Sequence, residues 1–297
     1  MYKLPVWETI GTCYRFVWAE RRAWFDYVLI PVVAISVIPL LLMWALLGTF
    51  QLPLGPSGLP DMQNSGGAIL GAMFLIWLLM VVIYVSFAVA WHRRFLLGPD
   101  RTSPRELFTW QRRHWAFVWR GVLITLMAIA IGFAIGFVVS ILLGIVGGIL
   151  HAGGNTSAGI FLGGISWFAM MLLIFALMVG PMLVFPATAI EDEEFTIGSG
   201  WRIASDNRWR MVGIYLFGVF IPVFIVQFLL LLALGGGIMA MDPNAADTVH
   251  DSFSFGLVLN LISNAVYFLG VAIGVSMLSI MYRRLRDNVP SNESASA

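Results

Sequence analysis

Cysteine and charge are the two features that this sequence has least of. Among 297 residues the single cysteine is Cys13, which excludes an internal disulfide and a cysteine-based metal cluster. Charged residues make up 11% of the chain, whereas soluble domains carry about 25%. Hydrophobic residues make up 60%, and several apolar stretches exceed the roughly 20 residues that cross a bilayer as a helix. The composition therefore predicts an all-α polytopic membrane protein.

Asp, Glu, Lys and Arg are absent from the predicted spans. These spans lie at about 27–50, 67–91, 121–150, 160–190, 211–241 and 253–282. Ionisable residues within a bilayer mark proton relays and ion-coupled carriers, so their absence argues against a proton-driven carrier and against intramembrane hydrolysis. The histidines lie at span ends or in loops without a paired ligand spacing such as HExxH. We therefore expect a protein that is not an enzyme, with no catalytic residue, metal ligand or cofactor.

A continuous apolar signal peptide core is also missing from the first 24 residues, which carry scattered charges, so no cleavable signal is expected. Residues 4–24 instead place Val6, Ile10, Cys13, Tyr14 and Val17 on one helical face. Arginines and tryptophans accompany that face. The pattern predicts a helix that lies at the membrane surface.

Positive charge is confined to one side of the predicted topology. With six spans, all 17 lysines and arginines fall in the terminal segments, the loop between spans two and three, or the loop between spans four and five. The other three loops hold none, and positively charged segments mark the cytoplasmic side. We therefore predict a protein of the bacterial cytoplasmic (inner) membrane with both termini in the cytoplasm.

The loop between spans two and three contains a second predicted surface helix. Ser103-Pro104-Arg105-Glu106 has the order of a capping box, with a hydroxyl at the N-cap, proline at the first helical position and Glu106 reaching back. Leu107, Trp110, Trp115 and Val118 would then share one face. We expect an amphipathic interfacial helix here.

Similar short sequence motifs recur at a spacing of 90 residues. Arg112 matches Arg202 (202 − 112 = 90), and Trp119-Arg120 matches Trp209-Arg210 (209 − 119 = 90). Residues 10–15 resemble 197–202 as well. We therefore predict one transmembrane domain over 1–288, built from three parallel hairpin repeats that are each preceded by an interfacial helix. The predicted repeats are about 5–91, 103–190 and 197–284, and residues 289–297 have the composition of a disordered cytoplasmic tail.

An acidic cluster follows the fourth span, where two other span ends carry paired arginines. We predict that Glu193 or Glu194 pairs with an arginine of the loop between spans two and three or of the C-terminal segment. The alternative is a solvated acidic loop, because exposed ion pairs contribute only about 0–1 kcal/mol.

Arginines and tryptophans at the predicted cytoplasmic surface are candidate contacts for lipid or a partner protein. The set is Arg15, Arg112, Arg113, Trp119, Arg120, Trp201, Arg202, Trp209 and Arg210. Arginines near an anionic leaflet contribute about 1 kcal/mol each. The alternative is that they only set topology and anchor the helices. Expected partners are membrane lipids, with anionic lipids as one candidate, and a membrane protein or second copy; nucleic acid is not expected.

Polar side chains inside the spans are uncharged. Gln227, Asn260 and Asn264 form a candidate intramembrane polar cluster, in which the two asparagines share a helix face at i,i+4. Amides in such positions commonly bond across helices. Contact with a lipid headgroup or a small polar ligand is the alternative.

Short motifs give a resemblance to a known family. The run from Pro186 through Glu191-Asp192 and Ser199-Gly200-Trp201-Arg202 to Asn207-Arg208-Trp209-Arg210 resembles the juxtamembrane signature of the membrane domain of some bacterial glycerophosphodiester phosphodiesterases and of related uncharacterised six-span bacterial families. WHRRFLLG at 91–98 is similar to a run in proteobacterial members. The resemblance covers the arrangement of most of the chain. It implies catalysis by an appended soluble barrel, for which this chain has no room, so that activity is not expected.

Two functions remain open on the sequence. The first is a non-catalytic lipid-contacting scaffold, anchor or assembly factor. The second is a small permease or lipid-handling transporter. A continuous polar cavity lined by Gln227, Asn260 or Asn264 would favour transport, whereas tight packing would favour the scaffold.

Overall fold

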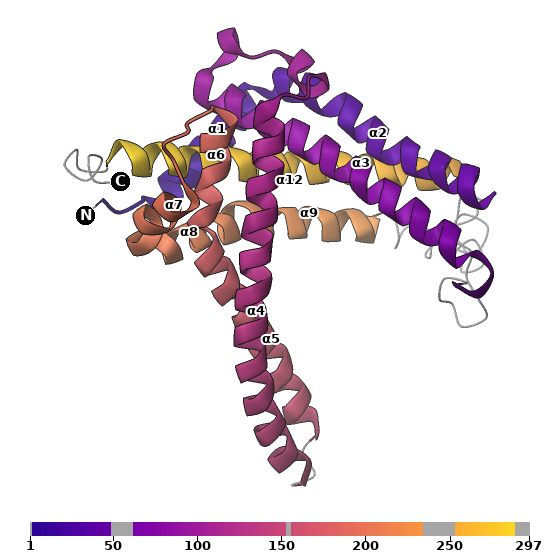
Figure 1. Ribbon diagram of the computed structural model, residues 1–297, viewed down its shortest axis with the longest axis vertical. Helices are drawn as coiled ribbons and strands as arrows, with labels where there is room; N and C mark the ends of the chain where they lie inside the picture. Colours follow the sequence, from indigo (N-terminus) through magenta and orange to yellow (C-terminus); the bar gives the residue numbers. More distant parts are fainter. Residues whose placement is uncertain (1, 49–61, 153–155, 234–252, 289–297) are drawn as a thin grey trace. The chain divides into compact units, whose positions relative to one another are not determined.

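The computed structural model describes residues 2–48, 62–152, 156–233 and 253–288, and within these residues it forms helices and no strands (Figure 1). The α-helices are α1 (Val6–Ala19), α2 (Arg21–Leu47), α3 (Met62–Leu97), α4 (Arg112–Ala152), α5 (Thr156–Met178), α6 (Val184–Ala189), α7 (Ile197–Ala204), α8 (Arg208–Tyr215), α9 (Ile221–Leu231) and α12 (Phe253–Asp287). The predicted all-helical class is confirmed for this part of the chain. The predicted tail 289–297, residues 51–61 and 153–155 of the first two predicted outer loops, and the whole of the third at 242–252 lie outside it.

Six helical runs within the described residues are long and apolar enough to cross a membrane. They are Arg21–Leu47, Gly66–Leu97, Arg112–Gly147, Phe161–Met178, Ile197–Leu230 and Asn260–Asp287. Each run overlaps one predicted span, and six helices of this length and composition support a multi-pass membrane protein. Several helices continue past the apolar stretch into arginine-bearing residues, as α4 does by beginning at Arg112.

Prolines follow the end of the fourth run and divide the fifth. α5 ends at Met178, and a 3₁₀ turn, Pro181–Leu183, precedes α6. Pro222 stands at the start of α9, directly after a π turn at Leu216–Phe220. Proline supplies no backbone N–H to the preceding turn, which accounts for both breaks. The predicted end of the fifth span at 241 lies outside the described residues.

The chain divides into two compact units. The first unit contains the described parts of 1–11, 112–215 and 277–297, and the second contains those of 12–111 and 216–276. Residues 197–284, predicted as the third repeat, therefore contribute to both units.

In the first unit, α4 packs along α5 and against α6, and α7 packs on the 3₁₀ turn at Pro181–Leu183. The last contact depends on two glycines. A Cβ placed at Gly200 would lie 2.6 Å from the backbone oxygen of Gly180, which is far inside van der Waals contact. Only glycine lets the two backbones come this close.

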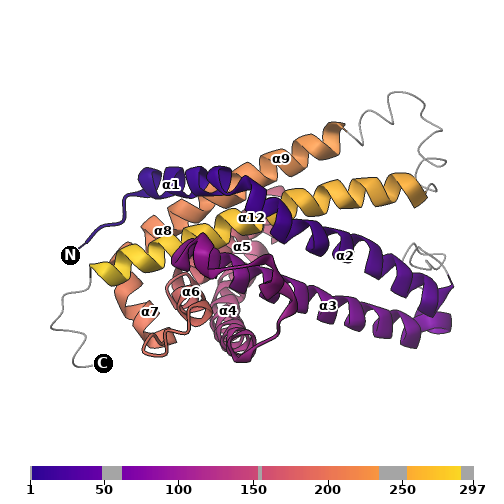
Figure 2. The same ribbon diagram turned by 90° about the horizontal axis from the view of Figure 1, so that it is seen from above.

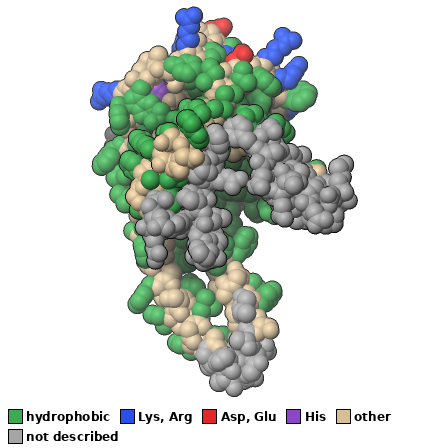
Figure 3. Space-filling view, turned by 90° about the vertical axis from the view of Figure 1, so that its right-hand side faces the viewer, with side chains coloured by type: hydrophobic (Ala, Val, Ile, Leu, Met, Phe, Trp, Pro, Cys, Tyr) green, Lys and Arg blue, Asp and Glu red, His purple; other side chains and the backbone are tan. Residues whose placement is uncertain are grey.

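The outer surface of α4 and α5 is apolar. Phe133 and Phe137 of α4 are 77% and 68% exposed, and Phe161 of α5 is 69% exposed. Residues 121–178 contain no charged side chain. Figure 3 shows hydrophobic side chains along these helices. Large exposed apolar surfaces of this kind are suited to contact with lipid.

In the second unit, α2 and α3 lie side by side in both views and pack on each other (Figures 1 and 2). Trp91 of α3 is fully buried, and its Nε1 donates to Ala272 O and to Ser276 Oγ of α12, both at 3.0 Å. The ring of Phe87 stacks on Trp91 at a centroid distance of 5.9 Å. A neutral aromatic core with a satisfied indole N–H thus joins α3 to α12.

α1 is tied into the second unit through Tyr14, whose Oη donates to Gly218 O at 2.9 Å within the π turn. Burial raises the pKa of the Tyr14 hydroxyl above its usual range. The hydroxyl therefore stays protonated at neutral pH and keeps its role as donor.

The second predicted interfacial helix is wrong in its extent. Pro104–Phe108 is a 3₁₀ turn, residues 109–111 are not helical, and α4 begins at Arg112. Ser103 Oγ does accept from Arg105 N, at 3.4 Å. The carboxylate of Glu106, however, binds Arg93 Nε at 2.9 Å, so it does not close the predicted capping box. Helices are present at the first and third predicted positions, as α1 and α7.

Candidate functional site

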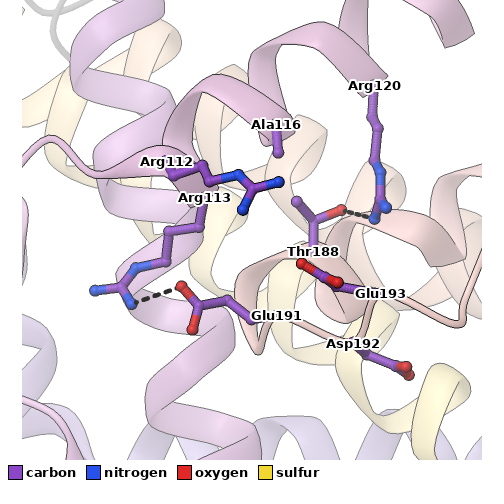
Figure 4. A pocket seen from close by; sticks show the side chains of 8 residues that line it. All are labelled: Arg112, Arg113, Ala116, Arg120, Thr188, Glu191, Asp192 and Glu193. Carbon is purple, nitrogen blue, oxygen red and sulfur yellow. Dashed lines mark hydrogen bonds and ion pairs between the residues drawn. The ribbon is translucent and has the colours of Figure 1, made fainter.

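Arginines and carboxylates of the first unit line a cleft of about 520 Å³, which we call the arginine–carboxylate cleft (Figure 4). Its lining residues are Arg112, Arg113, Ala116, Arg120, Thr188, Glu191, Asp192 and Glu193. Three of the predicted contact arginines and one of the predicted ion-pair acids therefore meet in one place.

The first turns of α4 supply the basic wall of the cleft. Arg112, Ala116 and Arg120 are spaced by four residues and follow one another along one helix face. Arg120 Nη1 donates to Thr188 Oγ1 at 2.6 Å, and the Thr188 hydroxyl donates to Val184 O at 2.6 Å. In Figure 4 the Arg112 side chain extends over Ala116 toward the middle of the cleft. α6 thus holds one guanidinium in place beside a second.

The turn that ends α6 supplies the acidic wall. Glu191 has a φ of 61°, a left-handed conformation that is uncommon for a residue other than glycine. Its N–H donates to Thr188 O at 3.1 Å, and Asp192 N donates to Ala187 O at 2.9 Å. These bonds satisfy the last carbonyls of the helix, as left-handed C-terminal turns do. Consecutive carboxylates are thereby set close to the arginines of α4.

Glu191 and Asp192 form different ion pairs. Glu191 Oε1 lies 3.4 Å from Arg113 Nη1, whose side chain is 8% exposed. Asp192, whose side chain is 10% exposed, pairs with Arg286 and accepts a hydrogen bond from Tyr282 Oη at the end of α12. Arg286 Nη1 also donates to Tyr282 Oη at 2.6 Å. The loop after α6 is therefore fastened to α4 on one side and to α12 on the other.

The two predicted ion-pair acids differ in their surroundings. Glu194 Oε2 lies 3.9 Å from Arg286 Nη2 in the C-terminal segment, and its side chain is 92% exposed. Glu193 lines the cleft and lies next to Thr188 in Figure 4. The shorter ion pairs belong to Glu191 and Asp192, which the sequence prediction did not single out.

The candidate lipid or partner contacts in the third predicted repeat lie on α7 and α8. The guanidinium of Arg208 stands 5.1 Å from the ring centroid of Trp201. Arg210 Nη1 donates to Leu4 O at 2.9 Å. Trp209 is 65% exposed, and Arg202 is exposed as well. These side chains do not line the arginine–carboxylate cleft.

Arg15 and Trp119 are exposed on their helices. Arg15 belongs to α1 in the second unit, whereas Trp119 stands on α4 beside the cleft residue Arg120. Arg15 is thus a candidate lipid or partner contact that does not belong to the arginine–carboxylate cleft.

The predicted intramembrane amides divide into two interhelical links within the second unit. Asn264 Nδ2 donates to Ser36 Oγ of α2 at 3.0 Å and also to Asn260. Gln227 Nε2 of α9 donates to Ser263 O of α12 at 3.4 Å. The amides bond α12 to two other helices.

Thr188, Glu191 and Asp192 are the site residues that sequence reasoning missed. The acidic cluster was visible, but which carboxylate faces which arginine depends on the left-handed turn at Glu191. Thr188 gave no signal, because a single threonine in an apolar helix commonly bonds only its own backbone.

Groups of three or more His, Cys, Asp or Glu able to hold a metal ion do not occur in the part of the chain that the structure describes. Comparison of the chain with protein-family models, curated proteins and solved structures finds no match.

Proposed function

We propose that this chain is an integral protein of the bacterial inner membrane that acts without catalysis, as a lipid-contacting scaffold, anchor or assembly factor. The observation that carries the proposal is the separation of charge along the first unit. Residues 121–178 contain no charged side chain, whereas the first turns of α4 combine arginines with exposed tryptophans. Tryptophan and arginine together are typical of a helix where it leaves the bilayer.

Both termini face the cytoplasm in this proposal, and the six spans form three parallel hairpins. Direct contacts between α2 and α3 and between α4 and α5 support it, as does the bond from Gln227 of α9 to Ser263 of α12. The matched tryptophans of the 90-residue spacing, Trp119 and Trp209, are also similarly exposed, at 62% and 65%.

A role in lipid contact is supported by exposed groups on α4, α7 and α8. Arg112, Arg202 and Trp209 are open to the surroundings. Arginine near an anionic leaflet contributes about 1 kcal/mol. The resemblance of 186–210 to juxtamembrane segments of membrane domains beside bacterial phosphodiesterases belongs to the same proposal and brings no activity with it.

A transporter is the weaker alternative. Asn264 is engaged with Ser36, and Gln227 with the backbone of Ser263, at 3.0 and 3.4 Å. Amides that link helices stabilise packing. This favours the scaffold.

Native mass spectrometry of the detergent-extracted protein tests the proposal. We expect retained phospholipid or a partner chain, and less of it in the double variant Arg112→Gln/Arg202→Gln. Arg101→Gln/Arg105→Gln is a matched control, since it removes the same charge at exposed positions of the other unit. Bare protein with neither lipid nor partner would contradict the proposed function.

A further inference from the structure

The arginine–carboxylate cleft has opposite charges on facing walls, and not all of them are used within the protein. Arg113 pairs with Glu191, and Asp192 pairs with Arg286. Arg112, Arg120 and Glu193 lie around the middle of the cleft, where Figure 4 draws them about Thr188, and the charge of Glu193 acts on Arg120. A ligand that fits must therefore offer an anion to two guanidiniums and a cation to one carboxylate.

Phosphate suits the basic side of this arrangement. A guanidinium presents five N–H donors in a planar fork that matches phosphate oxygens. Arg120 spends one Nη1 bond on Thr188 at 2.6 Å, which fixes its position and leaves further donors. Arg112 is the exposed arginine two helical turns earlier on the same face, with the small side chain of Ala116 between the two. The two together form a clamp for one phosphate.

Glu193 decides the class of phosphate. The charge of Glu193 already acts on Arg120, so a phosphate bound by Arg120 would lie close to this carboxylate and the two negative charges would repel each other. A primary ammonium two carbons from the phosphate supplies a balancing cation and three N–H donors. The cleft volume of about 520 Å³ is ample for such a headgroup.

The surface beside the cleft is suited to the rest of a lipid. Trp115, Trp119, Val122 and Leu126 of α4 are spaced by four, three and four residues, and are 65%, 62%, 41% and 56% exposed. They form an apolar stripe next to the arginine face, since Trp119 and Arg120 are consecutive and about 100° apart around the helix. Tryptophans also mark the headgroup level of a bilayer. A lipid can place its headgroup in the cleft and its acyl chain along this stripe.

We propose that the arginine–carboxylate cleft binds the headgroup of a zwitterionic phospholipid with a primary ammonium, with its phosphate on Arg112 and Arg120 and its ammonium on Glu193. The proposal rests on the proposed function, because it names the lipid that the scaffold contacts.

The test is native mass spectrometry of the full chain, delipidated and then exposed to equal amounts of phosphatidylethanolamine, phosphatidylglycerol and phosphatidylcholine. The wild type retains phosphatidylethanolamine preferentially. Glu193→Gln lowers the ratio of bound phosphatidylethanolamine to phosphatidylglycerol by about tenfold, as expected for the loss of one charge-assisted hydrogen bond. Glu194→Gln is the matched control: it removes the same charge from a neighbour that is 92% exposed, and it leaves the ratio unchanged.

Further measurements test separately how the phosphate and the ammonium of the lipid are recognised. Arg112→Gln, at an exposed position, weakens retention of all three lipids. Phosphatidylcholine, whose methylated ammonium lacks N–H donors, binds more weakly than phosphatidylethanolamine, and inorganic phosphate does not displace the bound lipid. Equal binding of the two zwitterionic lipids, displacement by inorganic phosphate, or equal effects of Glu193→Gln and Glu194→Gln would overturn the inference while leaving the proposed function standing. A protein that retains no lipid would overturn the inference, and one that retains neither lipid nor a partner chain would overturn the proposed function as well.

Discussion

Two segments that match at the 90-residue spacing fold differently. We call them the second lead-in, 103–120, and the third lead-in, 193–210. In the second, a 3₁₀ turn and a short break lead to α4, which then runs unbroken from Arg112. In the third, α7 forms first, and the break falls at Ser205–Asn207 before α8. Similarity of the two sequences therefore does not determine where the helix breaks.

Single residues at matched positions explain the difference. Thr196 caps α7 by accepting from Ser199 N at 3.1 Å, whereas its counterpart Glu106 (196 − 90 = 106) is paired with Arg93. Asn207 stands at the later break, whereas its counterpart Phe117 (207 − 90 = 117) packs on Phe185 at 4.7 Å inside the first unit. A capping hydroxyl and a polar residue at the break make α7 a helix separate from α8 in the third lead-in. The matched positions of the second lead-in lack both, so α4 begins at Arg112 and continues without a break.

The largest expected effect comes from Gly200, which only the third lead-in uses for close packing. Gly200→Ala places a Cβ 2.6 Å from Gly180 O, so α7 must move away from the turn at Pro181–Leu183. We expect a loss of about 3 kcal/mol, at the upper end for overpacking. Thermal unfolding in detergent measures it.

Gly213→Ala in α8 is the control for this change, because no neighbour lies within 4 Å of the added Cβ. Alanine within a helix should raise stability there by about 0.5–1 kcal/mol. Equal effects at both glycines would show that α7 is not packed through Gly200.

The break at Asn207 gives the next largest effect. Asn207 is buried, its Oδ1 accepts from Leu4 N at 2.8 Å, and its Nδ2 donates to Tyr2 O at 3.0 Å. Asn207→Ala leaves these backbone groups without partners, which costs about 1–3 kcal/mol. We expect faster trypsin cleavage after Lys3, read by mass spectrometry, with exposed Asp206→Ala as control. Unchanged cleavage would show that Asn207 does not hold the N-terminal segment.

Two acids around the start of the third lead-in, one just before it and one within it, should rank by burial. Asp192→Asn weakens the contacts to Arg286 and Tyr282 and should cost about 1 kcal/mol, since Arg286 is 41% exposed and partly screened. Glu194→Gln should cost about 0–1 kcal/mol, near the lower limit, because its side chain is 92% exposed. Unfolding midpoints in low salt compare the two, and a larger loss at Glu194 would contradict this ranking.

The smallest effect is expected where the two lead-ins agree. Trp119→Ala and Trp209→Ala remove side chains that are 62% and 65% exposed, so each should change stability in detergent by no more than about 0.5 kcal/mol. A large loss at only one of them would mean that the matched tryptophans serve different roles.

Composition and apolar length were enough to predict the helical class and the six spans. A helix for α1 also followed from the spacing of its apolar residues, and Cys13 and Val17 are buried as that face requires. These features depend on local patterns and on the length of a bilayer crossing, which a sequence carries directly.

The arginine–carboxylate cleft could be predicted only in part. Arg112, Arg113 and Arg120 were singled out, but their meeting with Glu191 and Asp192 depends on the left-handed turn after α6. The second interfacial helix failed for a similar reason, because Glu106 has a tertiary partner in Arg93 that outweighs its local capping role. Contacts between distant residues decided both cases.

Cysteine labelling across the membrane tests the central claim, that an even number of crossings puts every arginine-bearing segment in one compartment. In a Cys13→Ser background, Arg112→Cys, Asp61→Cys and His250→Cys are labelled with an impermeant maleimide in right-side-out and inside-out vesicles. We expect Arg112→Cys to be labelled only from the cytoplasmic side, and Asp61→Cys and His250→Cys only from the opposite side. Labelling of either loop position from the same side as Arg112→Cys would contradict the six-span account.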